Sequence, residues 1–570
     1  MENISLNGVW KGKPDFKNIG IENQWFRPDS FDKSDINLLD IKIPGSFNLL
    51  DGIEVFEGIF WHFFEFEIVG IENDNKDFFL NFKAANFNTK VWMNGKFIGE
   101  HNGGFTPFRF IINDYINPKK NFLAVRSDNQ RKKDRLPALV FDWFNWGGIY
   151  RNVDLQIMDK NRISNIKIKT KSISLKECSV EISIMVKGVV SINWEIFESN
   201  DLDILYRGNL TDISGVINFE VTLKNYKLWS PETPNLYCFK ITKLNQDSHD
   251  SSIYKENFGI REIEIKGNYI YLNKRVIRLK GVSLHEELMP YGRTIPFKER
   301  ENDLKRMKSL GFNALRTSHY SHDEALLSIA DKLGLLILEE IPVYFLCDFK
   351  NPKTFRLAAK MVKSLIERDF NHPSVIWWSV GNEIPIERPR AARFIKNLMK
   401  WVKRFDDSRI VTYVSMKLFS DLTRRYADVA TINFYFGWYV GSPRLISLML
   451  DVMRTSAFHK PWIYTEFGAG AKYGYHDIWK NQTKFSEERQ LYVLDHSIKT
   501  FNSKSYLAGW FIWIYRDFRS LTRQNKYQEG YNRKGIVSEK NETKLIYHQL
   551  PKILNQKREL VNRNMESKGI

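Results

Sequence analysis

Two glutamates each come directly after an apolar segment of the chain. Glu383 follows the segment VIWWSVGN at 375–382, and Glu466 follows PWIYT at 461–465. A carboxylate is a poor core residue, because it needs an opposite charge, hydrogen-bond donors or water around it. Two carboxyl groups at such positions suit the cleavage of a glycosidic bond, in which one protonates the leaving oxygen and the other acts on the anomeric carbon. A structural ion pair is the alternative for either residue taken alone.

A second short stretch has the residue types needed to hold an anion. In YNRKGIV, residues 531–537, Asn532 and Lys534 are two positions apart. Lysine supplies a point charge with three donors, and the asparagine amide adds directional hydrogen bonding. An ordinary polar turn is the alternative.

Other polar and aromatic residues also follow apolar segments. Asn382 precedes Glu383 and is a candidate for binding a sugar hydroxyl, and a tyrosine, Tyr435 or Tyr439, is a candidate for orienting the nucleophile. His285, His319 and Trp513 come at the ends of three further segments. For His319 a satisfied core histidine is the alternative.

Eight apolar segments alternate with amphipathic ones after about residue 263. We expect strands at 276–282, 313–319, 335–341, 375–383, 410–415, 429–435, 461–467 and 509–515, and helices at 299–310, 323–333 and 354–370. This order predicts a closed (β/α)8 TIM barrel over residues 263–570. A doubly wound open sheet is the alternative, but no glycine-rich phosphate loop follows the first strand. In a barrel the carboxyl ends of the strands share one rim, so the candidate residues would converge there.

The chain before the barrel reads as strands and turns. Residues 1–158 predict an N-terminal jelly-roll-like β-sandwich with short aromatic strands, and residues 159–262 predict a smaller immunoglobulin-like β-sandwich. The sequence therefore predicts a multidomain protein with three domains.

Composition and charge narrow the class of protein. Of 570 residues, 43% are apolar, which excludes general disorder. The net charge of +18 comes from scattered lysines and arginines, so we expect neither nucleic acid nor a membrane as a partner. The three cysteines show no metal-ligand spacing, and the N-terminus has no apolar signal segment. We expect a reduced, cytoplasmic protein without a metal or cofactor, acting on a small-molecule glycoside.

SVGNE at 379–383 and TEFG at 465–468 resemble the acid/base and nucleophile strands of retaining barrel glycosidases. Together with two sandwiches before the barrel, they make the chain similar to glycoside hydrolase family 2 over nearly its whole length. The resemblance implies that Glu383 is the general acid/base, Glu466 the nucleophile and Asn382 the partner of the sugar 2-hydroxyl. Members of the family are often oligomers, so a homo-oligomer is a further expectation.

Several stretches are more similar to the β-glucuronidases of that family. FDWFNWGGIYR at 141–151 resembles a loop that brings an aspartate, here Asp142, to the sugar. INFYFGWYVG at 432–441 implies that Tyr439 lies near the nucleophile, and KGVSLHEE at 280–287 that His285 lies near the sugar hydroxyls. RTSHY at 316–320, which carries His319, also fits, and WIYRDF at 513–518 implies that Trp513 lies beneath the sugar.

In the same resemblance Asn532 and Lys534 bind the C6 carboxylate of the sugar. Bacterial β-glucuronidases tend to have an arginine four residues before this asparagine, and here that position is Gln528. Arg523, Lys526 and Arg533 are the candidates for a replacement. The predicted function is thus a retaining exo-glycosidase acting on β-D-glucuronides. A β-galactosidase of the same family and a non-catalytic carbohydrate-binding homologue are the alternatives.

Overall fold

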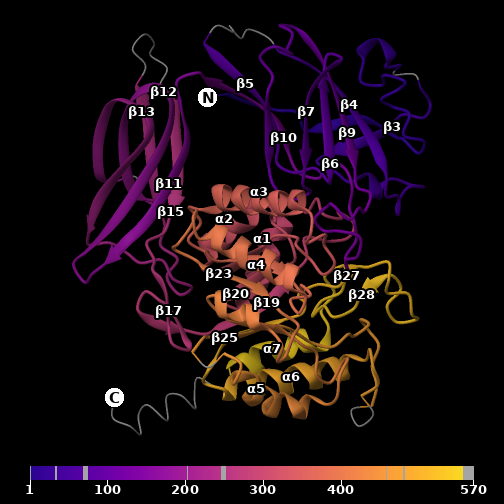
Figure 1. Ribbon diagram of the computed structural model, residues 1–570, viewed down its shortest axis with the longest axis vertical. Coiled ribbons are helices and arrows are strands. Elements are labelled where there is room, and N and C mark those ends of the chain that lie inside the picture. Colours follow the sequence, from indigo (N-terminus) through magenta and orange to yellow (C-terminus); the bar gives the residue numbers. More distant parts are fainter. Residues whose placement is uncertain are drawn as a thin grey trace.

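The computed structural model describes residues 2–32, 35–68, 75–201, 203–244, 252–457, 459–478 and 482–555. Figure 1 shows two β-sandwiches, one indigo to purple and one magenta, standing side by side above a body of strands and helices in orange and yellow. That body contains eight parallel strands with helices around them. The predicted fold class, two β-sandwiches followed by a (β/α)8 barrel, is confirmed.

Two antiparallel sheets form the first sandwich. Their orders are β1-β10-β5-β8 and β3-β2-β4-β9-β6-β7. The bounds are β1 Glu2–Ser5, β2 Gly8–Pro14, β3 Leu39–Ile43, β4 Ile59–Glu67, β5 Lys76–Phe82, β6 Asn88–Met93, β7 Lys96–Asn102, β8 Phe108–Ile111, β9 Lys120–Asp128 and β10 Val153–Asp159. In β4, Phe60 belongs to the core between the sheets, whereas Trp61 and Phe63 pack in a separate aromatic cluster. Because both faces of β4 are buried, its sequence lacks a clean polar alternation.

The second sandwich is built on two long strands. β12 (Glu177–Glu198) pairs along most of its length with β13 (Ile204–Lys224), and the other strands are β11 Arg162–Ile173, β14 Tyr237–Leu244 and β15 Ser252–Phe258. β11 pairs with the first half of β12 and β14 with the second half, with register shifts between the two halves. Such irregularities bend a strand, which lets the isoleucine-rich core of this sandwich close.

The barrel strands lie within a few residues of the predicted segments. Their order is β23-β22-β21-β20-β19-β26-β25-β24, all parallel. The bounds are β19 Leu279–Leu284, β20 Ala314–Thr317, β21 Leu336–Glu340, β22 Val375–Asn382, β23 Ile410–Val414, β24 Ala430–Asn433, β25 Trp462–Phe467 and β26 Leu507–Ile512. Between β23 and β24 the Thr431 hydroxyl donates to the Tyr413 carbonyl at 2.6 Å, and the Asn433 amide donates to the Ser415 carbonyl at 2.8 Å. β23 and β24 are the two ends of the strand order among the described strands, and these bonds nearly close the barrel between them.

Helices surround the barrel with the apolar faces that the sequence predicts. They are α1 Phe297–Ser309, α2 Glu324–Leu333, α3 Pro352–Asp369, α4 Pro389–Val402, α5 Ile446–Arg454, α6 Glu487–Ser503 and α7 Leu545–Asn555. The carboxylate of Asp323 caps α2 by accepting from the Ala325 amide, and Gly334 ends it at φ +67°. Of the helices in the described ranges, none combines the length and the apolar character needed to span a bilayer.

The amino-terminal end of the barrel is covered by a three-stranded sheet. The sheet consists of β16 (Ile263–Lys266), β17 (Tyr269–Leu272) and β18 (Arg275–Ile277). Ile270 and Leu272 of β17 pack against residues at the amino-terminal ends of the barrel strands. The first barrel strand was expected at 276–282, but residues 275–277 belong to this cover and β19 begins only at Leu279.

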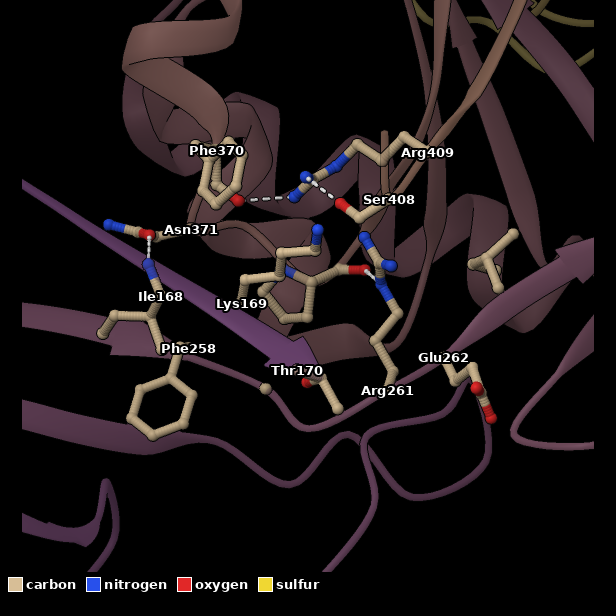
Figure 2. Close-up of a pocket in the computed structure, with 13 residues that line it drawn as sticks. Ile168, Lys169, Thr170, Phe258, Arg261, Glu262, Phe370, Asn371, Ser408 and Arg409 are labelled. Carbon is tan, nitrogen blue, oxygen red and sulfur yellow. Dashed lines mark hydrogen bonds between the residues drawn. The ribbon is translucent and has the colours of Figure 1, made fainter. Parts of the chain in front are cut away.

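A small cavity of about 150 Å³ lies between the second sandwich and this end of the barrel (Figure 2). Arg261 donates from Nε to the Pro373 carbonyl at 2.9 Å and from Nη2 to the Val375 carbonyl at 2.7 Å. The Asn371 side chain accepts from the Ile168 amide of β11 at 2.9 Å. Burial lowers the pKa of Arg261 to about 9. These contacts fix the sandwich to the start of β22, the end of the strand opposite to Glu383.

Candidate active site

The carboxyl ends of β22 and β25 bring Glu383 and Glu466 to the same rim of the barrel. The guanidinium of Arg316, at the end of β20, connects Glu466 to the neighbour of Glu383. Its Nη1 donates to Glu466 Oε1 at 2.7 Å, and its Nη2 donates to Asn382 Oδ1 at 2.8 Å. Asn433, at the end of β24, donates from Nδ2 to Glu383 Oε1 and to Asn382 Oδ1, both at 3.1 Å. One connected set of hydrogen bonds therefore links both carboxyl groups.

Glu383 is held in a conformation that only its surroundings can maintain. Its φ is +52°, in the left-handed region, and its amide donates to the Val414 carbonyl at 2.9 Å. For a residue other than glycine this conformation costs about 1–3 kcal/mol. Two positions earlier, Gly381 lies so close to the segment that follows β21 that a Cβ would come within 2.7 Å of the Val343 carbonyl. The SVGNE segment thus places the Glu383 carboxyl by a strained turn at the strand end.

The pKa of the Glu383 carboxyl is raised from 4.5 to about 7. Burial is the largest cause, and the negative charge of Glu466 is the second; the hydrogen bond from Asn433 opposes both. A carboxyl group with this pKa can both donate and accept a proton near neutral pH.

Glu466 is almost completely buried and both its oxygens are occupied. Tyr435 donates from its hydroxyl to Oε2 at 2.7 Å, while Arg316 donates to Oε1. His319 Nε2 lies 3.8 Å from Oε1. Burial and the charge of Glu466 raise the pKa of Tyr435 well above its usual value, so this tyrosine stays a neutral donor. The carboxylate is therefore fixed in orientation beside a permanent positive charge.

Glu340, at the end of β21, is the counter-ion on the other side of Arg316. Arg316 Nη2 lies 3.1 Å from Glu340 Oε2, and the carboxylate also contacts His319 Nδ1 and the Ser379 hydroxyl, both at 2.8 Å. Because Asn382 Oδ1 is held by Arg316 and Asn433, its Nδ2 has a fixed direction. This buried nitrogen has no hydrogen-bond partner in the part of the chain that the structure describes. It is a donor available to a ligand.

Aromatic rings pack around the two histidines of the site. Trp513 stacks on His319 with ring centroids 5.0 Å apart and meets His285 edge-on at 5.4 Å. Trp143, from the first sandwich, contacts both histidines at 5.5–5.6 Å. His285 Nδ1 contacts the Tyr320 hydroxyl at 3.1 Å, and burial lowers the pKa of His285 far below its usual value. The imidazole is neutral at pH 7 and its buried Nε2 is unpaired within the described ranges.

Asn532 and Lys534 adjoin the carboxylate pair. Lys534 Nζ donates to the Tyr439 hydroxyl at 2.8 Å and lies 5.4 Å from the ring of Tyr435, the tyrosine that binds Glu466. Asn532 Oδ1 lies 3.3 Å from the same ammonium. Lys534 is 3% exposed, so its charge is directed into the site and is little screened by solvent.

Asp142 comes to this rim from the loop that leads into β10. Its carboxylate is bound by Arg523 Nη2 at 2.5 Å, by the Ser520 hydroxyl at 2.5 Å and by Asn532 Nδ2 at 3.2 Å. Residues 520 and 523 belong to the segment between β27 (Phe518–Arg519) and β28 (Tyr531–Asn532). Figure 1 shows the lower end of the first sandwich meeting the part of the barrel that carries these two strands.

All eleven residues that the sequence proposed for the site lie in this one region. Asp142, His285, His319, Asn382, Glu383, Tyr435, Tyr439, Glu466, Trp513, Asn532 and Lys534 are joined by the contacts described above. The structure adds residues that the sequence did not propose for the site: Trp143, Arg316, Glu340 and Asn433. Of the three candidates for a second cation, it brings Arg523 to the site through Asp142. Arg316, Glu340 and Asn433 stand at strand ends, which was the available signal for them.

Family models match consecutive parts of the chain. "Glycosyl hydrolases family 2, sugar binding domain" covers residues 4–158, "Glycosyl hydrolases family 2" covers 158–261, and "Glycosyl hydrolases family 2, TIM barrel domain" covers 263–553. The last alone matches about half of the chain.

Known proteins resemble the chain over almost its full length. A β-glucuronidase of Streptococcus agalactiae is 28% identical, with 96% of this chain and 95% of that protein aligned. A solved β-D-glucuronidase of Dictyoglomus thermophilum has 26% identity and a TM-score of 0.87, with 97% of each chain covered. A β-glucuronidase of Bifidobacterium dentium superposes with a TM-score of 0.90 over 97% of each chain at 24% identity, a likeness of fold. The chain belongs to glycoside hydrolase family 2, and it is a glycoside hydrolase.

Proposed function

We propose that the protein hydrolyses β-D-glucuronides by a double displacement that retains the configuration at the anomeric carbon. The observation that carries the proposal is the buried ammonium of Lys534 next to the carboxylate pair. It is linked to Glu466 through Tyr439 and Tyr435, whose rings lie 5.3 Å apart. The similarity to β-glucuronidases supports the same substrate. We further propose that three domains, 1–158, 159–262 and 263–570, divide the chain.

Glu466 acts as the nucleophile in this proposal. Its carboxylate oxygen forms a bond with the anomeric carbon while the bond from that carbon to the leaving oxygen breaks. Arg316 and Tyr435 hold the carboxylate in one orientation, so little reorganisation is needed before attack. The product of this step is a covalent glycosyl-enzyme.

Glu383 acts first as the acid and then as the base. With a pKa of about 7 it is protonated in a large fraction of molecules near neutral pH, and it gives its proton to the leaving oxygen. It then removes a proton from the water that attacks the anomeric carbon, which releases Glu466. After the first step Glu466 is an ester without charge, so the second cause of the raised pKa of Glu383 is gone. The pKa of Glu383 therefore falls, and its carboxylate is ionised and ready to accept that proton.

Asn382, His285, His319 and Trp513 bind the sugar. Arg316 and Asn433 hold the side-chain amide of Asn382 in place, and its Nδ2 has no hydrogen-bond partner among the described residues. We assign this nitrogen to the 2-hydroxyl of the sugar. A hydrogen bond to this hydroxyl strengthens as the oxocarbenium-like transition state forms. Trp513 presents a flat apolar ring beside the two histidines, which suits the apolar face of a sugar.

Lys534 and Asn532 bind the C6 carboxylate. A uronate would satisfy the buried ammonium, whereas a neutral galactoside would leave it without a counter-charge, which disfavours the alternative substrate. The test compares kcat/KM for an aryl β-D-glucuronide with that for the aryl β-D-galactoside. Preference for the galactoside would reject the proposed substrate.

The mechanism is tested separately by the configuration of the first-formed sugar, followed by NMR during hydrolysis. The β-anomer is expected first. If the α-anomer forms first, the reaction inverts the configuration and Glu466 cannot be the nucleophile.

A further inference from the structure

The residues that the sequence offered as a second cation for the C6 carboxylate lie in very different places. Gln528, which stands where an arginine was expected, is buried and accepts from Asn525 Nδ2 at 2.7 Å. Arg533 lies 3.5 Å from Asp517 and forms an ion pair with Glu539. Lys526 is exposed, with its ammonium 5.0 Å from the ring of Tyr527. None of these three side chains forms a hydrogen bond or ion pair with Lys534, Asn532 or Tyr439 in the described structure.

Arg523 is the exception. Its Nη1 donates to the Tyr439 hydroxyl at 3.2 Å, and Lys534 Nζ donates to the same oxygen at 2.8 Å. One oxygen therefore accepts from an ammonium and from a guanidinium. These two positive charges lower the pKa of Tyr439, because they stabilise negative charge on its oxygen. They would stabilise any other anionic oxygen at this point in the same way. The two cations converge on a position suited to an anionic oxygen.

The guanidinium is held there by Asp142. The carboxylate accepts from Arg523 Nε at 3.2 Å and from Nη2 at 2.5 Å, a fork that leaves Nη1 directed at Tyr439. Asp142 also accepts from the Ser520 hydroxyl and from Asn532 Nδ2. A carboxylate has about four acceptor positions, so Asp142 has little capacity left for a sugar hydroxyl. Its contacts make it a positioning residue for the cation and for Asn532.

The charge balance agrees with an anionic ligand. Asp142 offsets one of the two positive charges, so the group of Asp142, Arg523 and Lys534 keeps a net charge of about +1 at neutral pH. A single carboxylate neutralises it, whereas a hydroxymethyl group at C6 does not.

We propose that Arg523 is a specificity-determining residue, which binds the C6 carboxylate of the substrate together with Lys534 and is oriented by Asp142 from the first sandwich. The inference rests on the proposed β-D-glucuronide substrate. Arg523, in the segment between β27 and β28, takes the role of second cation that Gln528 does not fill. Because Asp142 orients Arg523, the first sandwich also contributes to sugar preference.

The test uses three variants of the full-length protein: Arg523→Gln, Arg523→Lys and the matched control Lys526→Gln, which removes an exposed positive charge from the same segment. For each, kcat/KM is measured with an aryl β-D-glucuronide and with the aryl β-D-glucoside, which differs only at C6. Inhibition by D-glucuronate and by D-glucose gives the same comparison without turnover.

Arg523→Gln should reduce kcat/KM for the glucuronide about ten- to a hundred-fold, the range of a lost charge-assisted hydrogen bond, mainly through KM. The inhibition constant of D-glucuronate should rise by a similar factor, while that of D-glucose stays within about two-fold. Arg523→Lys should fall between, since it keeps the charge without the fork. Lys526→Gln should match the wild type.

Two results would overturn the inference. In the first, Arg523→Gln and Lys526→Gln are equally active on the glucuronide. In the second, Arg523→Gln loses affinity for charged and neutral sugars alike, which would make the residue structural. A wild-type protein that prefers neutral glycosides would instead reject the proposed function itself, so the two failures are distinguishable.

Discussion

The raised pKa of Glu383 predicts where the enzyme loses activity as pH increases. If Glu383 must be protonated to assist departure of the leaving group, kcat/KM follows its protonated fraction. With a pKa of about 7 this fraction is about nine-tenths at pH 6, about half at pH 7 and about a tenth at pH 8. The rise from 4.5 to about 7 corresponds to about 3 kcal/mol of unfavourable ionisation, due first to burial and then to the charge of Glu466.

The assay measures kcat/KM from pH 5 to pH 9 with aryl β-D-glucuronides whose phenols differ in acidity. For a poor leaving group, kcat/KM of the wild type should fall about ten-fold between pH 6 and pH 8. Glu383→Gln should lose this high-pH decline, with activity reduced about 10²–10⁴-fold on poor leaving groups and much less on very acidic phenols.

A second variant tests the cause of the raised pKa. In Glu466→Gln the charge of Glu466 is gone but the burial remains, so the pKa of Glu383 should fall and still exceed 4.5. Carboxyl ¹³C chemical shifts measured during a pH titration report it directly. A wild type with constant kcat/KM between pH 6 and pH 8, or a Glu383→Gln variant that keeps the same decline, would refute the reasoning.

Three further predictions concern other groups. Glu466→Gln should abolish turnover of every glycoside, so detectable multiple turnover by the purified variant would contradict the assigned nucleophile. Lys534→Ala should reduce kcat/KM for glucuronides about a hundred-fold and spare the neutral glycosides, and an equal loss on both would remove the support for a carboxylate site. The Asp331 carboxylate raises the pKa of His372, despite burial, from 6.5 to about 9. This pair stabilises the fold fully below pH 6.5 and is lost as pH rises through 9, so Asp331→Asn should lower Tm more at pH 6 than at pH 10, and an equal loss at both would exclude the charge effect.

The barrel geometry explains why so much of the site was visible in the sequence. Parallel strands place their carboxyl ends at one rim whatever the loops do, so Glu383 and Glu466 converge without any knowledge of the packing. The role of Arg316 could not be predicted in the same way, since it depends on which side chains face it from β21, β22 and β25. Arg523 was one of three candidates, and its contacts with Tyr439 and Asp142 distinguish it from the other two.

Strands and helices were predictable where the hydrophobic residues of a segment follow one clear pattern. The strand that ends at Glu383 was expected at 375–383 and is observed at Val375–Asn382. The first barrel strand was misplaced by three residues, because the residues at 275–277 continue the apolar pattern but pair with β17 in the covering sheet. A run of apolar residues does not reveal which of two neighbouring sheets its parts will join.

The contact between Asp142 and Arg523 joins positions 381 residues apart in the chain. The second of the two is synthesised 381 residues after the first, so the complete site cannot form until that length of chain has been produced. Closing so long a loop is slow compared with local helix formation. Discrimination between charged and neutral sugars is therefore a late event in maturation. It also gives an activity-based measure of whether the first sandwich has docked correctly on the barrel.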